Sequence, residues 1–315
     1  MAESGRLDAV LQTMVSDQVG AMFRRIVSGD PTGRPPWVQA IEDGDDAGLF
    51  GPGSAPWVVH GHLATLAGGV RALLLQASHP GALVGVREHS RFRDDALGRL
   101  AGTTRWLVTL TFGSTALAER ESARVRRMHE RVRGSYEPPG EPGVRRRYSA
   151  ADQDLLRWVH VTFTDSFLTA HEAWGGQIPG GPDAYVAAWG RAAQLLGLVD
   201  PPRSRAELDE QMLAFEPVLD GGTAVREMAR FVLAPPLPFV ARPAYAVLGA
   251  GAVATLPRVH RERLGLPWVP GRTARLATRG LLAALRLALG DTSPSEQAAR
   301  ARLARLHAGS ATTAS

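Results

Sequence analysis

Apolar residues recur every three or four positions along most of the chain, and this spacing predicts helices rather than strands. The first such segment runs from Leu7 to Ile26 and stops near Gly29. A loop rich in proline and glycine follows at 31–56. The next apolar run predicts one helix from Trp57 to Ala77, which ends there because Pro80 follows and residues before a proline disfavour helical backbone.

Start and stop signals predict several shorter helices in the next part of the chain. A short helix from Pro80 to His89 is followed by one that Asp94 can cap and that runs towards Phe112. A further helix occupies 113–134, with Gly134 as its C-terminal glycine. Each of these segments is short enough to pack as one element of a helical core.

The second half of the chain continues the helical pattern. The segment from Ser135 to Tyr148 is rich in proline and glycine and predicts a loop. Ser149 to Asp152 resembles a capping box and opens a helix that reaches about Trp174, and Ser204 to Glu207 is a second box. The segment from Arg272 to Leu289 predicts a basic amphipathic helix.

No repeat or long linker divides the chain, so the pattern predicts one all-α domain over residues 1–308. Hydrophobic residues make up 44% of the sequence, which is ample for a sizeable core. The tail 309–315 consists of small and polar residues, and we expect it to be disordered.

Composition excludes several kinds of chemistry. The chain has no cysteine, which excludes disulfides, thiolate haem and cysteine-ligated clusters, and no lysine, which excludes a Schiff base and a P-loop. The formal net charge is only +5, and the arginines alternate with acidic residues. The one tight basic run, Arg145 to Arg147, is typical of a solvated loop, so no nucleic-acid partner is expected.

Targeting signals are also missing from the pattern. Glu3 and Asp8 precede any apolar run, which argues against a secretory signal. The most apolar later stretch, Phe231 to Leu256, contains Arg242 and several prolines and is a poor membrane span. We therefore expect a cytoplasmic protein without a membrane span.

A glycine-rich run at Gly249 to Ala254 imitates a dinucleotide-binding fingerprint. The real motif needs a strand–helix–strand unit and an acidic residue for the ribose, and neither surrounds this run. Pro257 would also cut the helix that follows. The sequence therefore predicts close helix packing here rather than nucleotide binding.

Two histidines are placed on inward helix faces by their spacing. His129 shares a stripe with Ala118, Ser122 and Val125 on a helix whose other positions are mostly charged. His160 shares a face with the aromatic residues of the following long helix. Both fit either a core histidine bonded to backbone or a ligand of haem iron. The spacing of zinc proteases and of di-iron bundles is absent.

Arg99 and Thr103 lie four residues apart and so share one face of their predicted helix. Leu100, Trp106 and Leu107 supply apolar surroundings. A buried arginine needs an anion, and a haem propionate and an acidic residue of this chain are both candidates.

A set of short motifs in a fixed order resembles the family that contains rubber oxygenase (latex-clearing protein) and the oxygenase of the mycophenolic-acid pathway. The resemblance covers roughly residues 57–174. It rests on these motifs: Leu73 to Pro80, His89-Ser90, Arg99-x-x-x-Thr103, Phe112-Gly113, Met128-His129-x-x-Val132-x-Gly134, Tyr148-Ser149-Ala150 and Trp158-Val159-His160.

The resemblance implies haem b in a helical, globin-like core. Carried onto this chain, it makes His129 the proximal iron ligand and places Arg99 and Thr103 near the haem. His160 matches a further histidine of the family, in the cofactor's surroundings. The implied co-substrate is dioxygen, and the implied substrate is an apolar olefin.

The chain departs from the rubber oxygenases at one functional position. Those enzymes have a lysine just before the threonine that can cap the distal iron, and this chain has Gly102 there. The elements around His79 and His89 are those of the broader family. The two histidines are therefore candidates for a distal hydrogen-bond donor or general base.

We therefore expect a haem-b oxygenase that uses dioxygen on a small apolar or terpenoid-like substrate, with a possible electron donor as partner. Two alternatives remain open at this stage. One is a non-catalytic haem protein that carries oxygen or senses gas, and the other is a haem-free helical interaction protein.

Overall fold

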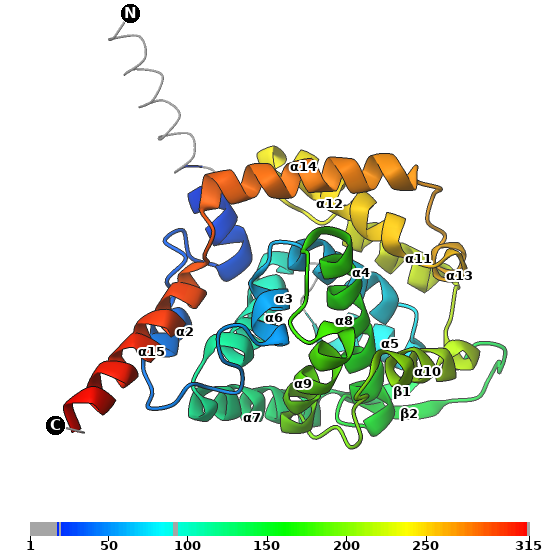
Figure 1. The fold of residues 1–315 in the computed structure, drawn as a ribbon. Coiled ribbons are helices and arrows are strands. Elements are labelled where there is room, and N and C mark those ends of the chain that lie inside the picture. Colours follow the sequence, from blue (N-terminus) through cyan, green and yellow to red (C-terminus); the bar gives the residue numbers. More distant parts are fainter. Residues whose placement is uncertain (1–17, 19, 91–93, 314–315) are drawn as a thin grey trace, which may run out of the picture.

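The computed structural model describes residue 18, residues 20–90 and residues 94–313. Helices dominate this part of the chain, together with one small hairpin, so the all-α prediction is confirmed apart from two short strands (Figure 1). Residues 20–28 are helical, and most of the helix predicted from Leu7 lies outside the described residues. The other elements are α2 (Pro36–Glu42), α3 (Ala55–Gly61), α4 (Thr65–Gln76), α5 (Pro80–His89), α6 (Ala96–Phe112), α7 (Thr115–Arg131), β1 (Arg133–Tyr136), β2 (Arg146–Ser149), α8 (Gln153–Trp174), α9 (Gly181–Leu195), α10 (Arg205–Ala214), η1 (Glu216–Val218), α11 (Thr223–Leu233), η2 (Phe239–Ala241), α12 (Arg242–Thr255), α13 (Arg258–Arg263), α14 (Gly271–Leu289) and α15 (Pro294–Thr313).

The centre of the fold is the packing of α4 against α8. Gly68 of α4 permits the close approach, because a Cβ atom at this position would lie 2.7 Å from a ring carbon of Phe167 and 3.1 Å from the carbonyl oxygen of Ser166. Beside it, the Arg71 guanidinium donates to Asp165 at 2.5 Å and to the Ser166 hydroxyl at 2.9 Å. Arg71 and Asp165 are both buried, so this ion pair replaces water for both charges.

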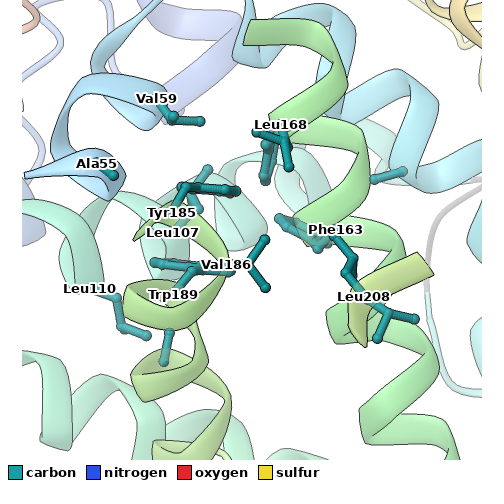
Figure 2. Packing of buried hydrophobic residues seen from close by; sticks show 14 of the residues in the cluster. Ala55, Val59, Leu107, Leu110, Phe163, Leu168, Tyr185, Val186, Trp189 and Leu208 are labelled. Atoms are coloured by element: carbon teal, nitrogen blue, oxygen red, sulfur yellow. The ribbon is translucent and has the colours of Figure 1, made fainter. Parts of the chain in front are cut away.

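A large apolar core joins α8 to α3, α6 and α9. Figure 2 shows Leu107 of α6, Phe163 and Leu168 of α8, and Trp189 of α9 directed towards one another. His60 of α3 also lies inside this core, with its two ring nitrogens 2.9 Å from hydroxyl oxygens of Thr111 and Tyr185. The core therefore contains a histidine that is fully bonded within the protein.

The glycine-rich run lies within α12, where it packs against α14. A Cβ atom at Gly251 would overlap the side chain of Thr278, and one at Gly249 would lie 3.2 Å from Leu233. The Thr278 hydroxyl donates to the carbonyl of Val247 at 3.2 Å. The prediction of close helix packing at this run is confirmed.

The C-terminal helix α15 is anchored by a buried arginine. Arg302 donates to the carbonyls of Phe112 at 2.8 Å and Asp46 at 3.1 Å, and also to that of Ile41. These bonds join α15 to the loop around α2 and to the end of α6. Helix α15 continues to Thr313, into the tail that we expected to be disordered.

The single helix predicted from Trp57 to Ala77 is wrong, because α3 and α4 are separate helices bent by 93° at the break. His62 has extended backbone at this break. Its ring Nδ1 accepts from the backbone N–H of Ala64 at 3.0 Å, and its carbonyl accepts from the hydroxyl of Thr65 at 2.8 Å. Side-chain bonds of this kind offer the backbone an alternative to continuing the helix.

The loop predicted from Ser135 to Tyr148 is also corrected. Its two ends form the antiparallel strands β1 and β2, in which Gly134 pairs with Tyr148. Gly134 is therefore not the C-terminal glycine of a helix. A Cβ atom there would lie 2.8 Å from the Tyr148 hydroxyl oxygen, so this glycine gives the tyrosine ring room to pack.

Several predicted helix boundaries are confirmed. Helices α5, α8 and α14 match their predicted segments, and α10 begins where Ser204 accepts from the N–H of Glu207 at 3.2 Å. Asp95 rather than Asp94 caps α6, through a 2.9 Å bond from the N–H of Gly98. In the part of the chain that the structure describes, no single helix has the length and apolar composition needed to cross a membrane.

The α4–α8 contact predicts opposite effects of alanine at two adjacent glycines. Gly68→Ala should lower the free energy of unfolding by about 1–3 kcal/mol, because backbone of α8 blocks the new methyl group. Gly69→Ala should have no cost and should gain up to about 1 kcal/mol of helix propensity, since no atom lies within 4 Å of its Cβ position. Urea unfolding followed by circular dichroism measures both. Equal stabilities for the two variants would contradict the close approach.

Buried histidines predict a loss of stability in acid. Burial lowers the pKa of His60 to about 3 and that of His160 to about 3, from an ordinary value of 6.5. Below about pH 6.5 the unfolded chain binds protons that the folded chain does not. Stability should then fall by about 1.4 kcal/mol per pH unit for each histidine until its folded pKa is reached.

Urea titrations between pH 7 and pH 5 measure this slope. His60→Gln should flatten it, while the same change at the exposed His307 should leave it unaltered. An unchanged slope in His60→Gln would contradict the prediction.

Candidate functional site

Helices α6 and α7 form a hairpin fastened by buried charge. Ser114 caps α7 by accepting from the N–H of Leu117. Glu121 of α7 is buried and accepts from Arg105 of α6 at 2.9 Å and from Arg124 at 2.7 Å. Because the two helices are joined through a short turn, this ion pair holds them side by side.

Residues at the end of α5 bond to both sides of this hairpin, at the end away from the turn between α6 and α7. Ser90 follows α5 directly, and its hydroxyl accepts from the Arg99 guanidinium at 2.6 Å. The adjacent His89 has its ring Nε2 at 3.0 Å from the carbonyl oxygen of Arg133, just after α7. The neighbouring residues Ser90 and His89 thus bond to Arg99, near the start of α6, and to the backbone just after α7. The last turn of α7 carries His129.

Aromatic contacts bring α8 to the same part of the α6 surface. Arg99, Thr103 and Trp106 share one face of α6 because they are separated by four and three residues. The rings of Trp106 and Phe163 of α8 are 6.1 Å apart in a T-shaped arrangement. His160 lies one turn before Phe163 on that face of α8, so it lies on the side of α8 that contacts α6.

Buried polar atoms without partners mark this region. Among the residues that the structure describes, Nδ1 of His129, the hydroxyl of Ser122, Nε1 of Trp106 and Nε of Arg105 are buried without a hydrogen bond. Ser122 and His129 are seven residues apart on α7 and therefore share a face. Other buried atoms without partners lie outside the hairpin, among them both ring nitrogens of His171 on α8. Since buried polar groups in proteins are nearly always paired, the hairpin atoms are candidate contacts for a bound molecule or ordered water.

Arg99 differs from the buried Arg71 in the groups that partner its charge. Burial lowers its pKa, and no carboxylate raises it again. Its ion-pair partner is missing among the described residues, where Ser90 supplies the bond to its guanidinium. No acidic residue in the described part of the chain therefore pairs with Arg99. Its positive charge is available to an anionic group.

The two inward histidines have different surroundings. Burial lowers the pKa of His129, so its ring is neutral near pH 7 and keeps a lone pair for a ligand role. His160 is more deeply buried, and its Nε2 lies 3.5 Å from the Thr164 hydroxyl. The Thr103 hydroxyl donates to the carbonyl of Arg99 at 3.2 Å, so its oxygen can still accept a hydrogen bond.

His79 lies away from this region. Its Nδ1 accepts from the N–H of Ala82 at 3.4 Å, which makes it the N-cap of α5. Its ring packs 6.2 Å from that of Trp158, which is two residues from His160 on α8. Side chains two apart on a helix point about 200° apart. His79 therefore lies on the other side of α8 from His160, whereas the exposed His89 lies near the end of α7.

Sequence reasoning missed the polar role of one residue here. The sequence interpretation includes Trp106 only in the apolar surroundings, although its position seven residues after Arg99 and three after Thr103 already indicates that it shares their helix face. A surface depression between the outer side of α7 and the end of α9 contains none of the predicted residues. It is lined by Glu119, Arg120, Ala123, Arg126, Gln194 and Leu195.

Comparison with known families agrees with the motifs of this site. Residues 57–287 match the family described as ER-bound oxygenase mpaB/B′/rubber oxygenase, catalytic domain. This range includes the α6–α7 hairpin, α8 and the helices that pack on them. No significant match was found among curated proteins or among solved structures. Because the matched range covers most of its length, the chain belongs to the mpaB/B′ and rubber oxygenase catalytic-domain family and is an enzyme of an oxygenase family.

Proposed function

We propose that the chain binds a b-type haem in the region between α6, α7 and α8, with His129 as the iron ligand, and uses it to oxygenate an apolar substrate. The observation that carries the proposal is the unpartnered Nδ1 of His129, buried on the same helix face as the unpartnered hydroxyl of Ser122. A neutral imidazole without an internal partner suits metal ligation.

The residues around His129 fit a haem better than a bare metal ion. The described residues contain no group of three His, Asp or Glu side chains that could hold an ion. A haem needs one protein ligand, because the macrocycle supplies four others. The half-buried Arg99, which has no carboxylate partner among the described residues, suits a haem propionate, and Trp106 and Phe163 supply apolar surface.

When bound, the haem would supply the activation of dioxygen. His129 would hold it through its lone pair, and Arg99 would bind and orient the propionate. The hydroxyl oxygen of Thr103 can accept a hydrogen bond while its hydrogen remains on the carbonyl of Arg99. Burial around His160 lowers its pKa to about 3, so it stays neutral and helps keep water out of the region.

The surroundings also restrict the substrate and the distal residues. Aromatic rings on α6 and α8 favour a small apolar or terpenoid-like molecule over a charged one. His89 lies at the end of the site that contains Arg99 and is the better candidate for a distal hydrogen-bond donor. His79, behind α8, would need a rearrangement to reach the same region. A globin-like arrangement of the core helices is part of this proposal.

The first test is haem binding by the His129 variant. His129→Ala should lose the Soret absorbance of the reconstituted protein or shift it strongly, because no second described histidine shares its face of α7. Circular dichroism should show unchanged helix content. His307→Ala, an exposed histidine on α15, is the matched control and should bind haem like the wild type.

Equal haem content in the two histidine variants would refute the ligand assignment. With haem bound, consumption of dioxygen in the presence of an apolar olefin then tests the oxygenase reaction. Reversible oxygen binding without consumption would instead identify a carrier or a sensor.

A second test concerns Arg99. Its removal should cost about 2 kcal/mol of haem binding, roughly thirtyfold in affinity, because a charge-assisted hydrogen bond to the propionate is lost. Arg131→Ala, on the exposed side of α7, should leave haem affinity unchanged. The rate at which each variant loses haem to excess apomyoglobin measures this difference. Equal rates in the two variants would contradict the propionate contact.

A further inference from the structure

Helix α14 has an apolar outer face in addition to the face that packs on the protein. Its inner face carries the buried residues Ala274, Thr278 and Leu282. This face packs against α12 and against the C-terminal part of α8. On the opposite side, Leu276 is 66% exposed and Leu287 is 88% exposed. These two leucines share a stripe with Gly280 and Ala283, because all four follow helical spacing. In Figure 1, α14 runs along the outer edge of the molecule.

A row of arginines borders this outer stripe. Arg272, Arg275, Arg279 and Arg286 recur at helical spacing along one edge of α14, and the helix contains no Asp or Glu. Arg286 pairs with Asp291 beyond the helix end, and Arg279 donates to the carbonyl of Ala173. In the described part of the chain, no carboxylate pairs with Arg272 or Arg275. The positive charge at this end of the row is uncompensated.

Further apolar side chains are exposed around the same helix. Trp268, three residues before α14, is 78% exposed. Phe239 and Val240 lie in η2, at the start of the helix α12 on which α14 packs, and both are largely exposed. Large apolar side chains singly on a surface are ordinary, but here they accompany a helix with a basic edge.

We propose that α14 lies flat on a membrane that contains anionic lipids, with Leu276 and Leu287 among the acyl chains and the arginine row among the headgroups. A basic edge beside an apolar face, with tryptophan at the end, is the pattern of interfacial helices. A second copy of this chain fits less well, because two arginine rows would face each other with no acidic residue of α14 to offset them. The proposal is independent of the haem site.

The absence of cysteine from the sequence allows a direct test by labelling. Single variants Leu276→Cys and Leu287→Cys of the full chain are coupled to an environment-sensitive fluorophore. Vesicles of phosphatidylcholine with phosphatidylserine should shift their emission to shorter wavelength, and vesicles of phosphatidylcholine alone should shift it much less. Leu213→Cys on α10, 69% exposed and far from α14 in Figure 1, is the matched control and should not respond.

Charge variants test the electrostatic part of the proposal. Neutralising Arg272 and Arg275 to Gln should weaken partitioning onto anionic vesicles about fivefold per residue, and high salt should weaken it for the wild type. Arg126→Gln with Arg127→Gln, on the exposed side of α7, should have little effect. Sedimentation with vesicles measures the partitioning, and circular dichroism checks that each variant is folded.

Three outcomes would overturn the membrane proposal. The first is equal emission shifts at Leu213 and at the α14 positions. The second is partitioning that does not depend on anionic lipid or on the α14 arginines. The third is emission from Leu287→Cys that is already shifted without vesicles, which would mean that another part of the chain or, if it depends on concentration, a second copy covers this face.

Discussion

The close packing of α4 on α8 is the contact that positions the rest of the fold. Gly68 lets the two backbones approach, and the ion pair of Arg71 with Asp165 lies where they meet. Arg205 of α10 adds a second positive charge 3.6 Å from Asp165. Burying these charges is costly unless each is paired and bonded, so the arrangement has little freedom to shift. Helix α8, fixed in this way, presents its other face to α6.

The buried Arg71 and the half-buried Arg99 differ in the groups that bond to their guanidinium. Arg71 has a carboxylate and a hydroxyl as partners, whereas Arg99 has only the hydroxyl of Ser90 among the described residues. The Arg71 guanidinium is thus paired with a carboxylate within the protein, although its Nε lacks a partner. The Arg99 guanidinium has no carboxylate partner among the described residues. The same contrast holds for histidines, because His60 is bonded through both ring nitrogens and Nδ1 of His129 is not bonded. Buried polar atoms without partners therefore occur on the α6–α7 hairpin, and others occur elsewhere in the described chain, including both ring nitrogens of His171 on α8.

The family relationship explains why these groups occur together on one chain. The matched range begins at α3 and extends into α14, so it includes both the α4–α8 centre and the hairpin. An oxygenase needs a water-poor region beside its reactive centre, and the aromatic contacts of Trp106 with Phe163 and Trp189 would supply one at the site that we propose. The outer face of α14 lies on another part of the molecule, and its exposed leucines do not belong to the core.

Local patterns in the sequence determined the helices and the inward faces of His129, His160 and the Arg99–Thr103 pair, because helical periodicity and capping act over a few residues. They also favoured helix packing over nucleotide binding at Gly249 to Ala254. The break at His62 and the pairing of Gly134 with Tyr148 escaped them, since each depends on side-chain bonds or strand pairing that spacing does not encode. Only the tertiary structure decided which inward residues meet. It placed Arg99 near the end of α7 through Ser90 and His89, and it placed His79 behind α8, because contacts between distant segments follow from packing and not from sequence separation.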